Sequence, residues 1–338
     1  MKQVLLFITG LAAGGFFYQL HVPIPFILAA MLVGLFSSQL PKRLRAPWPM
    51  QGRNAGLLVV GYAIGAAVTP EAWQDFVSQI FTIVAATVII VVVSAVIAYL
   101  MAKTMHADLA SCILGMMPGG LAMIMVLVED DRRFDPNIVM VTQVIRLFGV
   151  IFSVPLLAVL FFDARVAENV VTAGAADGLP WILFIPLGLC GALFFEKFHL
   201  PIPWMLGPAT ATALCAVFCN QVQGVPCWLM WPAQVAVGLK MGQLMDSKRV
   251  WAIKRLVPMI MAGTVILIGV SFLTANFLHC YYGLSLTTAF LAVAPGGISE
   301  MSIAGLAMGA DVAIILAYQL LRIFSISSFV PYLAQKFH

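Results

Sequence analysis

Charged residues are scarce in this sequence. Only 9% of its 338 residues are Asp, Glu, Lys or Arg, whereas about 25% of a typical soluble domain is charged. No stretch is long enough or polar enough to form a soluble catalytic domain. The formal net charge is only +4, and the basic residues stand in short loops between apolar segments. The charge therefore does not indicate nucleic-acid binding.

Residues that carry catalytic or metal chemistry are not clustered. The five histidines occur near the ends of apolar segments, and the six cysteines include no CxxC pair. Metal sites and catalytic thiols need clusters of such residues, and no phosphate-binding loop or nucleophile motif is present. We therefore expect no enzymatic activity, no metal and no cofactor. Cys219, Cys227 and Cys280 fall near one side of the predicted membrane. Two of them either form a disulfide there or stay as free thiols.

Long apolar segments dominate the chain. Hydrophobic residues make up 62% of it, and the mean hydropathy is +1.02. Apolar runs of about 18 residues or more recur from end to end, and this length crosses a bilayer as a helix. The sequence thus predicts an all-α polytopic membrane protein. The predicted segments are 3–20, 23–39, 52–69, 77–102, 107–128, 134–162, 179–197, 201–219, 226–246, 254–278, 284–308 and 311–334.

The two halves of the chain are related by duplication. His21–Pro25 (HVPIP) matches His199–Pro203 (HLPIP), and later residues recur at a nearly constant offset of 176 to 178 residues. A constant offset over a whole half is the signature of an internal repeat. We assign residues 1–162 to a first membrane repeat, 163–178 to a linker and 179–338 to a second repeat.

Glycine pairs and single aspartates are among the recurring residues. The glycine pairs predict faces of close helix packing. One aspartate precedes the last segment of each half and predicts an N-cap. These residues are Gly61/Gly65 with Gly238/Gly242, and Asp135 with Asp311.

One segment in each half is interrupted by Pro-Gly-Gly, in MPGG at Met117–Gly120 and in APGG at Ala294–Gly297. Proline removes a backbone donor and glycine relaxes the helix, so the helix breaks there. Broken backbone at membrane depth is tolerated only inside protein or beside a watery cavity. Free N–H groups and a helix dipole at the tip favour a carboxylate or phosphate; the alternative is a tight turn without a ligand. The predicted tip residues are Pro118, Gly119, Gly120, Pro295, Gly296 and Gly297.

A glutamine and an arginine follow each break, on one face of the last segment of each half. Each arginine lies about 16–18 Å deep in its segment, where an arginine costs at least ~2.5–3.5 kcal/mol. It therefore faces protein or a polar cavity. Either it binds an anionic group of a solute, or it braces carbonyl groups of the break or neutralises a carboxylate. The residues are Gln143 and Arg146 in the first half, and Gln319 and Arg322 in the second.

The two breaks differ in the residues that follow them. Ser299 and Glu300 follow APGG, whereas apolar residues follow MPGG. We include Ser299 in the predicted substrate site. A carboxylate near the middle of a membrane segment favours a proton or cation site, so we predict that Glu300 binds the coupling proton or sodium ion. The alternative is that Glu300 forms a salt bridge with Arg322 or Arg146.

The basic residues indicate a topology. If all twelve segments crossed the membrane, the excess of basic residues on the cytoplasmic side would vanish. If the two broken segments are re-entrant hairpins, 14 of the 18 Lys and Arg residues become cytoplasmic and only Arg165 lies outside. We therefore predict two inverted repeats, each with five membrane-spanning helices and one re-entrant segment, and cytoplasmic termini. Helices that cross and unwind at the break are the alternative.

Two motifs carry a resemblance to a known family: MPGG with TQVIRLF (Thr142–Phe148), and APGG with YQLLRIF (Tyr318–Phe324). With them the chain resembles, over about residues 5–335, the AbrB family of bacterial inner-membrane proteins, which carry a duplicated membrane domain. This family is similar to the cation/proton antiporter and anion transporter superfamily, whose fold uses inverted five-helix repeats. Family hairpins can carry Asp where this chain has Glu300.

Inverted repeats with broken helices are typical of secondary transporters. We expect secondary transport of a small anionic solute across the bacterial inner membrane. The lipid bilayer then surrounds the protein, and a homodimer is one alternative for its oligomeric state. Members of the similar family have been labelled regulators of gene expression, so a membrane-embedded sensor is the alternative. They have also been labelled ammonia monooxygenases, and the scattered His and Cys residues do not favour that activity.

Overall fold

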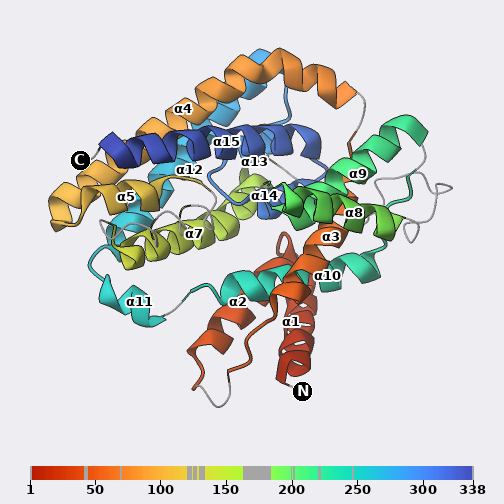
Figure 1. Ribbon diagram of the computed structural model, residues 1–338, viewed down its shortest axis with the longest axis horizontal. Helices are drawn as coiled ribbons and strands as arrows, with labels where there is room; N and C mark the ends of the chain where they lie inside the picture. The colour runs from red at the N-terminus through yellow and green to blue at the C-terminus, as the bar shows by residue number, and fades with distance from the viewer. Residues whose placement is uncertain are drawn as a thin grey trace. The chain divides into compact units, whose positions relative to one another are not determined.

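The computed structural model describes residues 2–41, 45–68, 71–119, 124, 128, 134–162, 184–198, 200, 202–219, 222–245 and 247–336. Every regular element in those ranges is a helix (Figure 1). The described fold is therefore all-α, as the sequence predicts. The predicted linker, 163–178, lies outside the described residues.

The helix bounds follow the predicted segments within a few residues. Two differences stand out, because α4 starts six residues before the predicted 77 and α11 was not predicted. The helices are α1 (Lys2–Gln19), α2 (Pro25–Gln39), α3 (Met50–Ala66), α4 (Glu71–Met105), α5 (Leu109–Met116), α7 (Pro136–Phe162), α8 (Phe184–Lys197), α9 (Pro203–Cys219), α10 (Cys227–Gly242), α11 (Ser247–Ala252), α12 (Val257–Tyr282), α13 (Leu286–Val293), α14 (Ile298–Ala307) and α15 (Val312–Lys336).

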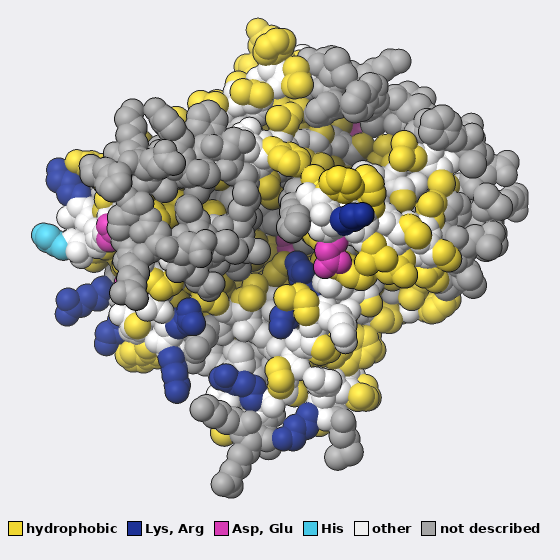
Figure 2. All heavy atoms as spheres, in the orientation of Figure 1, with side chains coloured by type: hydrophobic (Ala, Val, Ile, Leu, Met, Phe, Trp, Pro, Cys, Tyr) yellow, Lys and Arg dark blue, Asp and Glu magenta, His cyan; other side chains and the backbone are white. Residues whose placement is uncertain are grey.

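Three helices of the described chain are long and apolar enough to cross a membrane, judged by length and composition: Gln79–Met105, Pro136–Phe162 and Val257–Tyr282. Large apolar side chains lie exposed on α4 and α12, such as Phe81 (86%) and Leu273 (70%). Figure 2 shows apolar side chains over much of the visible face. Extensive exposed apolar surface marks an interaction site, and a lipid bilayer is one. The fold is consistent with an α-helical membrane protein.

The chain forms two compact units, and each unit draws on both halves of the sequence. Every predicted site residue belongs to the second unit. The first unit comprises Met1–Asp75, Val159–Leu244 and Ser302–Ala313, and the second comprises Phe76–Ala158, Met245–Met301 and Ile314–His338.

In the first unit, α3 packs against α9 through backbone contact. A Cβ atom on Gly61 would overlap the carbonyl oxygen of Met205, and one on Gly65 would overlap that of Ala209. Only glycine therefore permits this approach. Because the residue numbers of the contacting positions rise together along both helices, α3 and α9 run parallel.

The same arrangement joins α10 to α2. Gly238 lies against the carbonyl oxygen of Ile27, and Gly242 lies against that of Met31. These two helices also run parallel. The glycine pairs therefore form close packing faces, as the sequence predicts.

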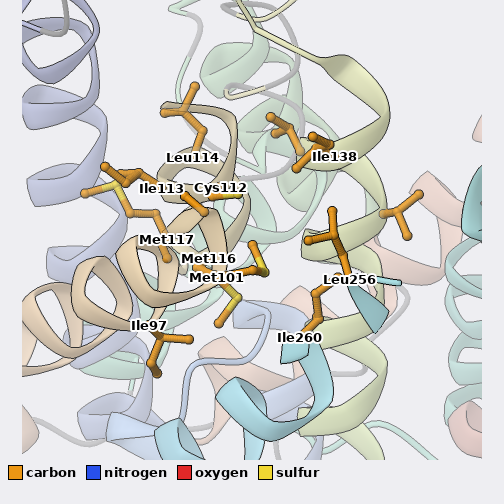
Figure 3. Packing of buried hydrophobic residues seen from close by; sticks show 14 of the residues in the cluster. Ile97, Met101, Cys112, Ile113, Leu114, Met116, Met117, Ile138, Leu256 and Ile260 are labelled. Carbon is orange, nitrogen blue, oxygen red and sulfur yellow. The ribbon is translucent and has the colours of Figure 1, made fainter. Parts of the chain in front are cut away.

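In the second unit, an apolar cluster surrounds the end of α5. Ile97 and Met101 of α4 meet Met116 of α5 and Ile260 of α12, and each is at most 8% exposed (Figure 3). Burying such side chains contributes about 1.5–3 kcal/mol each. This packing holds the first helix break in place.

Candidate functional site

The first break follows α5, a helix of only eight residues. Its N-cap is Asp108, whose side chain accepts a hydrogen bond from the Ser111 N–H at 2.7 Å. The helix ends at Met116, and Met117 is extended with ψ at 127°, because Pro118 disfavours helical backbone in the residue before it. Gly119 is described, whereas the predicted tip residue Gly120 lies outside the described residues.

The second break follows α13, which also has eight residues. Ser285 caps its start and accepts a hydrogen bond from the Thr288 N–H at 3.2 Å. Ala294, before Pro295, is extended with ψ at 136°, and helix resumes at Ile298 in α14. Pro-Gly-Gly therefore interrupts this segment, as the sequence predicts.

Gln319 and Arg322 of α15 hold the end of α13. A helix end leaves up to four carbonyl groups without partners. The Gln319 Nε2 group donates to the carbonyl oxygens of Leu291 and Ala294, at 3.1 Å each. The Arg322 guanidinium donates to Ala294 at 2.7 Å and to Gly296 at 2.8 Å, and also to the Gln319 Oε1 atom. The positive group thus lies at the negative end of the α13 dipole.

The end of α5 is held in the same way by α7. The Gln143 Nε2 group donates to the Leu114 carbonyl at 2.9 Å, and the Arg146 Nη1 group donates to the Met116 carbonyl at 2.6 Å. The structure therefore brings each predicted Gln–Arg pair to the break of its own half.

The start of α7 lies beside the start of α5. The Asp135 N–H donates to the Ser111 Oγ atom at 2.7 Å, and further along Gly115 lies against Thr142. The two helices therefore run parallel from the same level.

Both arginines are buried, with 3% of each side chain exposed. Within the described chain, the hydrogen bonds of Arg146 and Arg322 go to carbonyl oxygens and to Gln319, and neither Nε atom has a partner. A buried guanidinium charge is costly unless an opposite charge lies near it.

Glu300 lies in the first turn of α14 and is fully buried. Its Oε1 atom accepts a hydrogen bond from the Ser299 hydroxyl at 2.8 Å. A Cβ atom on Gly297 would overlap its Oε2 atom, so glycine makes room for the carboxylate. A negative group at a helix N-terminus is stabilised by the dipole. The described hydrogen bonds of Arg322 go to carbonyl groups and Gln319, and the ion pair of Glu300 with Arg322 or Arg146 stays a prediction.

The two recurring aspartates are N-caps. The Asp135 Oδ1 atom accepts from the Asn137 N–H at 2.8 Å, and the Asp311 Oδ1 atom accepts from the Ala313 N–H at 3.0 Å. These bonds satisfy donors that a helix start leaves open. The N-cap interpretation is confirmed.

Three buried polar residues near α13 had no role in the sequence interpretation: Gln79 and Thr87 on α4, and Tyr318 on α15. The Tyr318 hydroxyl donates to the Gln79 Oε1 atom at 3.3 Å. One sequence signal could have pointed to Thr87. It recurs as Thr264 at the repeat offset.

The cysteines and histidines do not form an evident centre. Cys227 and Cys280 are free thiols, and the Cys219 side chain lies outside the description. No group of three or more His, Cys, Asp or Glu side chains that could hold a metal ion occurs among the described residues.

Comparison with known proteins identifies the family of this sequence. Residues 26–338 match the family model AbrB, described as "Transition state regulatory protein AbrB". The chain is 25% identical over 350 residues to "Uncharacterized protein YhjN" of Bacillus subtilis (strain 168), covering 96% of this chain and 90% of that protein. It is 23% identical over 321 residues to "Putative regulator AbrB" of Escherichia coli (strain K12), covering 94% and 91%. Because the family model spans nearly the whole chain, this protein belongs to the AbrB family.

Proposed function

We propose that this protein is a secondary active transporter that moves a small anionic solute across the bacterial inner membrane. The observation that carries the proposal is the pair of helix breaks, each held by a buried arginine and glutamine. Buried charge inside a membrane fold marks substrate and ion pathways, and discontinuous helices form the binding sites of secondary transporters.

Parallel packing in the first unit supports inverted repeats. Consecutive helices α2 and α3 run in opposite directions if both cross the membrane. Because α9 runs parallel to α3, it runs opposite to α2, which is its counterpart in the first repeat. The glycine contacts between α10 and α2 lead to the same conclusion.

The second unit supports re-entrant segments at the breaks. If the first broken segment crossed the membrane, the next helix would return antiparallel to its first arm. Instead α7 starts beside the start of α5 and runs parallel to it. In the second half, Gln319 and Arg322 contact the end of α13 in rising order, so α15 also runs parallel to α13.

The charges favour an anionic solute. Carbonyl groups occupy some of the donors of Arg146 and Arg322, while the Nε atoms have no hydrogen-bond partner in the described chain. An anion close to either guanidinium group would lower the cost of its buried charge. Glu300, buried in the first turn of α14, is the proposed site of the coupling proton or sodium ion.

A two-step experiment tests this function. A thermal-shift screen of purified protein against small organic acids and phosphate finds ligands, because binding to the native state raises its apparent stability. The ligands found are then tested as labelled solutes in proteoliposomes under a proton or sodium gradient. We expect accumulation that depends on the gradient, and loss of that dependence in Glu300→Gln. Binding without accumulation for every ligand would contradict transport.

That contrary outcome would favour a sensor. The Escherichia coli relative is named a regulator, so a membrane-embedded regulator that binds the same ligand without moving it is the second candidate. The flux measurement separates the two functions, because both require binding and only a transporter requires accumulation.

A further inference from the structure

A small buried pocket lies between α4, α13 and α15, beside Arg322. The pocket has a volume of about 10 Å³, which suits one water molecule or one compact ion. Its polar wall comes from Thr87, Tyr318 and Arg322, and its remaining side chains are apolar. Each of these three residues is at most 7% exposed.

Within the described chain, the polar wall offers two free donors. The Thr87 hydroxyl group is one, and Arg322 contributes the other with its charge, whereas the Tyr318 hydroxyl already donates to the Gln79 Oε1 atom. The Arg322 Nη groups hold the α13 carbonyls, but its Nε atom is buried without a hydrogen-bond partner in the described chain. No Asp or Glu side chain lines the pocket. A cation is disfavoured there, because the guanidinium charge stands in the wall.

We propose that this pocket binds a compact anion, either a free halide or the single carboxylate group of a small solute. A compact anion fits the space, accepts a hydrogen bond from the Thr87 hydroxyl group and lowers the cost of the buried Arg322 charge. The inference rests on the proposed function only where it identifies the bound carboxylate with the transported solute.

Thermal unfolding of the purified full chain in detergent tests the site. Sodium chloride, sodium bromide or sodium acetate replaces sodium methanesulfonate at constant ionic strength, because methanesulfonate is too large for the pocket. We expect the Tm to rise in a saturable way with at least one compact anion. A response to chloride and bromide indicates a halide site, and a response to acetate alone indicates a carboxylate site. The absence of any saturable response would overturn the proposal.

A variant that removes one hydroxyl group locates the binding. Thr87→Val loses one hydrogen bond to an anion, so we expect it to weaken the apparent affinity about tenfold. Thr264→Val is the matched control, since Thr264 holds the equivalent position on α12 and donates to the Ile260 carbonyl at 2.8 Å. Its affinity should equal that of the wild type. Wild-type affinity in Thr87→Val would place the anion elsewhere and overturn the proposal.

Flux measurements separate this inference from transport. Anion stabilisation that is lost in Thr87→Val, without accumulation of any solute, would support the pocket and contradict transport. Solute accumulation without anion stabilisation would support transport and contradict the pocket.

Discussion

Within the part of the chain that the structure describes, Arg322 makes more hydrogen bonds to a helix break than Arg146. Arg322 donates to Ala294, Gly296 and Gln319, whereas Arg146 donates to Met116. In both halves the glutamine stands three residues before the arginine, so both side chains reach one helix end. The spacing on the last helix of each half thus matches the carbonyl groups that the break exposes.

We predict that Arg322→Gln destabilises the protein more than Arg146→Gln. A hydrogen bond to a charged group contributes about 1.5–3 kcal/mol, and Arg322 loses more of them. The free energy of unfolding should therefore fall by about 2 kcal/mol more in Arg322→Gln. Chemical unfolding of both variants in the same detergent measures the difference. Equal losses in the two variants would show that the additional bonds do not contribute to stability.

At the scale of the element, α5 and α13 are too short to persist alone, because isolated helices of eight residues are unstable in water. Each has a side-chain N-cap at its start and a Gln–Arg pair at its end. The short helices therefore depend on α7 and α15 for their carbonyl partners. Helix pairs of the first unit depend instead on glycine contact.

We predict that Gly61→Val lowers stability by separating α3 from α9. A Cβ atom there would overlap the Met205 carbonyl oxygen, and backbone cannot move aside as easily as a side chain. Overpacking of this kind typically costs about 1–3 kcal/mol. Gly15→Val in α1 is the control, because no atom lies within 4 Å of its added Cβ. Thermal unfolding should show a clear loss for Gly61→Val alone; an equal change in both variants would refute the packing explanation.

At the scale of the molecule, repeats and compact units do not coincide. The second unit combines Phe76–Ala158 from the first half with Met245–Met301 and Ile314–His338 from the second. Both helix breaks consequently belong to one unit. The Gln–Arg pairs of both halves of the sequence thus lie in a single compact unit.

Cysteine labelling tests the proposed topology. In a cysteine-free background, Thr104→Cys and Lys254→Cys should react only from the cytoplasmic side, and Tyr281→Cys only from the outer side. All three side chains are exposed, so a lack of reaction would report the membrane side rather than burial. If both broken segments crossed the membrane, Thr104→Cys and Lys254→Cys would react from opposite sides, which would contradict re-entrant segments.

The sequence by itself determined the helical class, most of the helix bounds, the Pro-Gly-Gly interruption of the second half and the N-caps Asp135 and Asp311. These features depend on neighbouring residues: proline before a glycine pair ends a helix, and an aspartate before a helix caps it. Asp135 and Asp311 are therefore N-caps in the structure, as the sequence predicts. The sequence did not anticipate α11, whose six residues leave only a short periodic pattern.

Only the tertiary structure decided which partners the buried charges take. The sequence allowed Arg322 to face a solute, a carboxylate or carbonyl groups, and the fold places it against carbonyl groups 26 and 28 residues away. It also decided that Thr87 and Tyr318 border one pocket with Arg322. Hydropathy and helix period describe how one segment behaves in lipid, whereas side-chain partners depend on packing between distant segments.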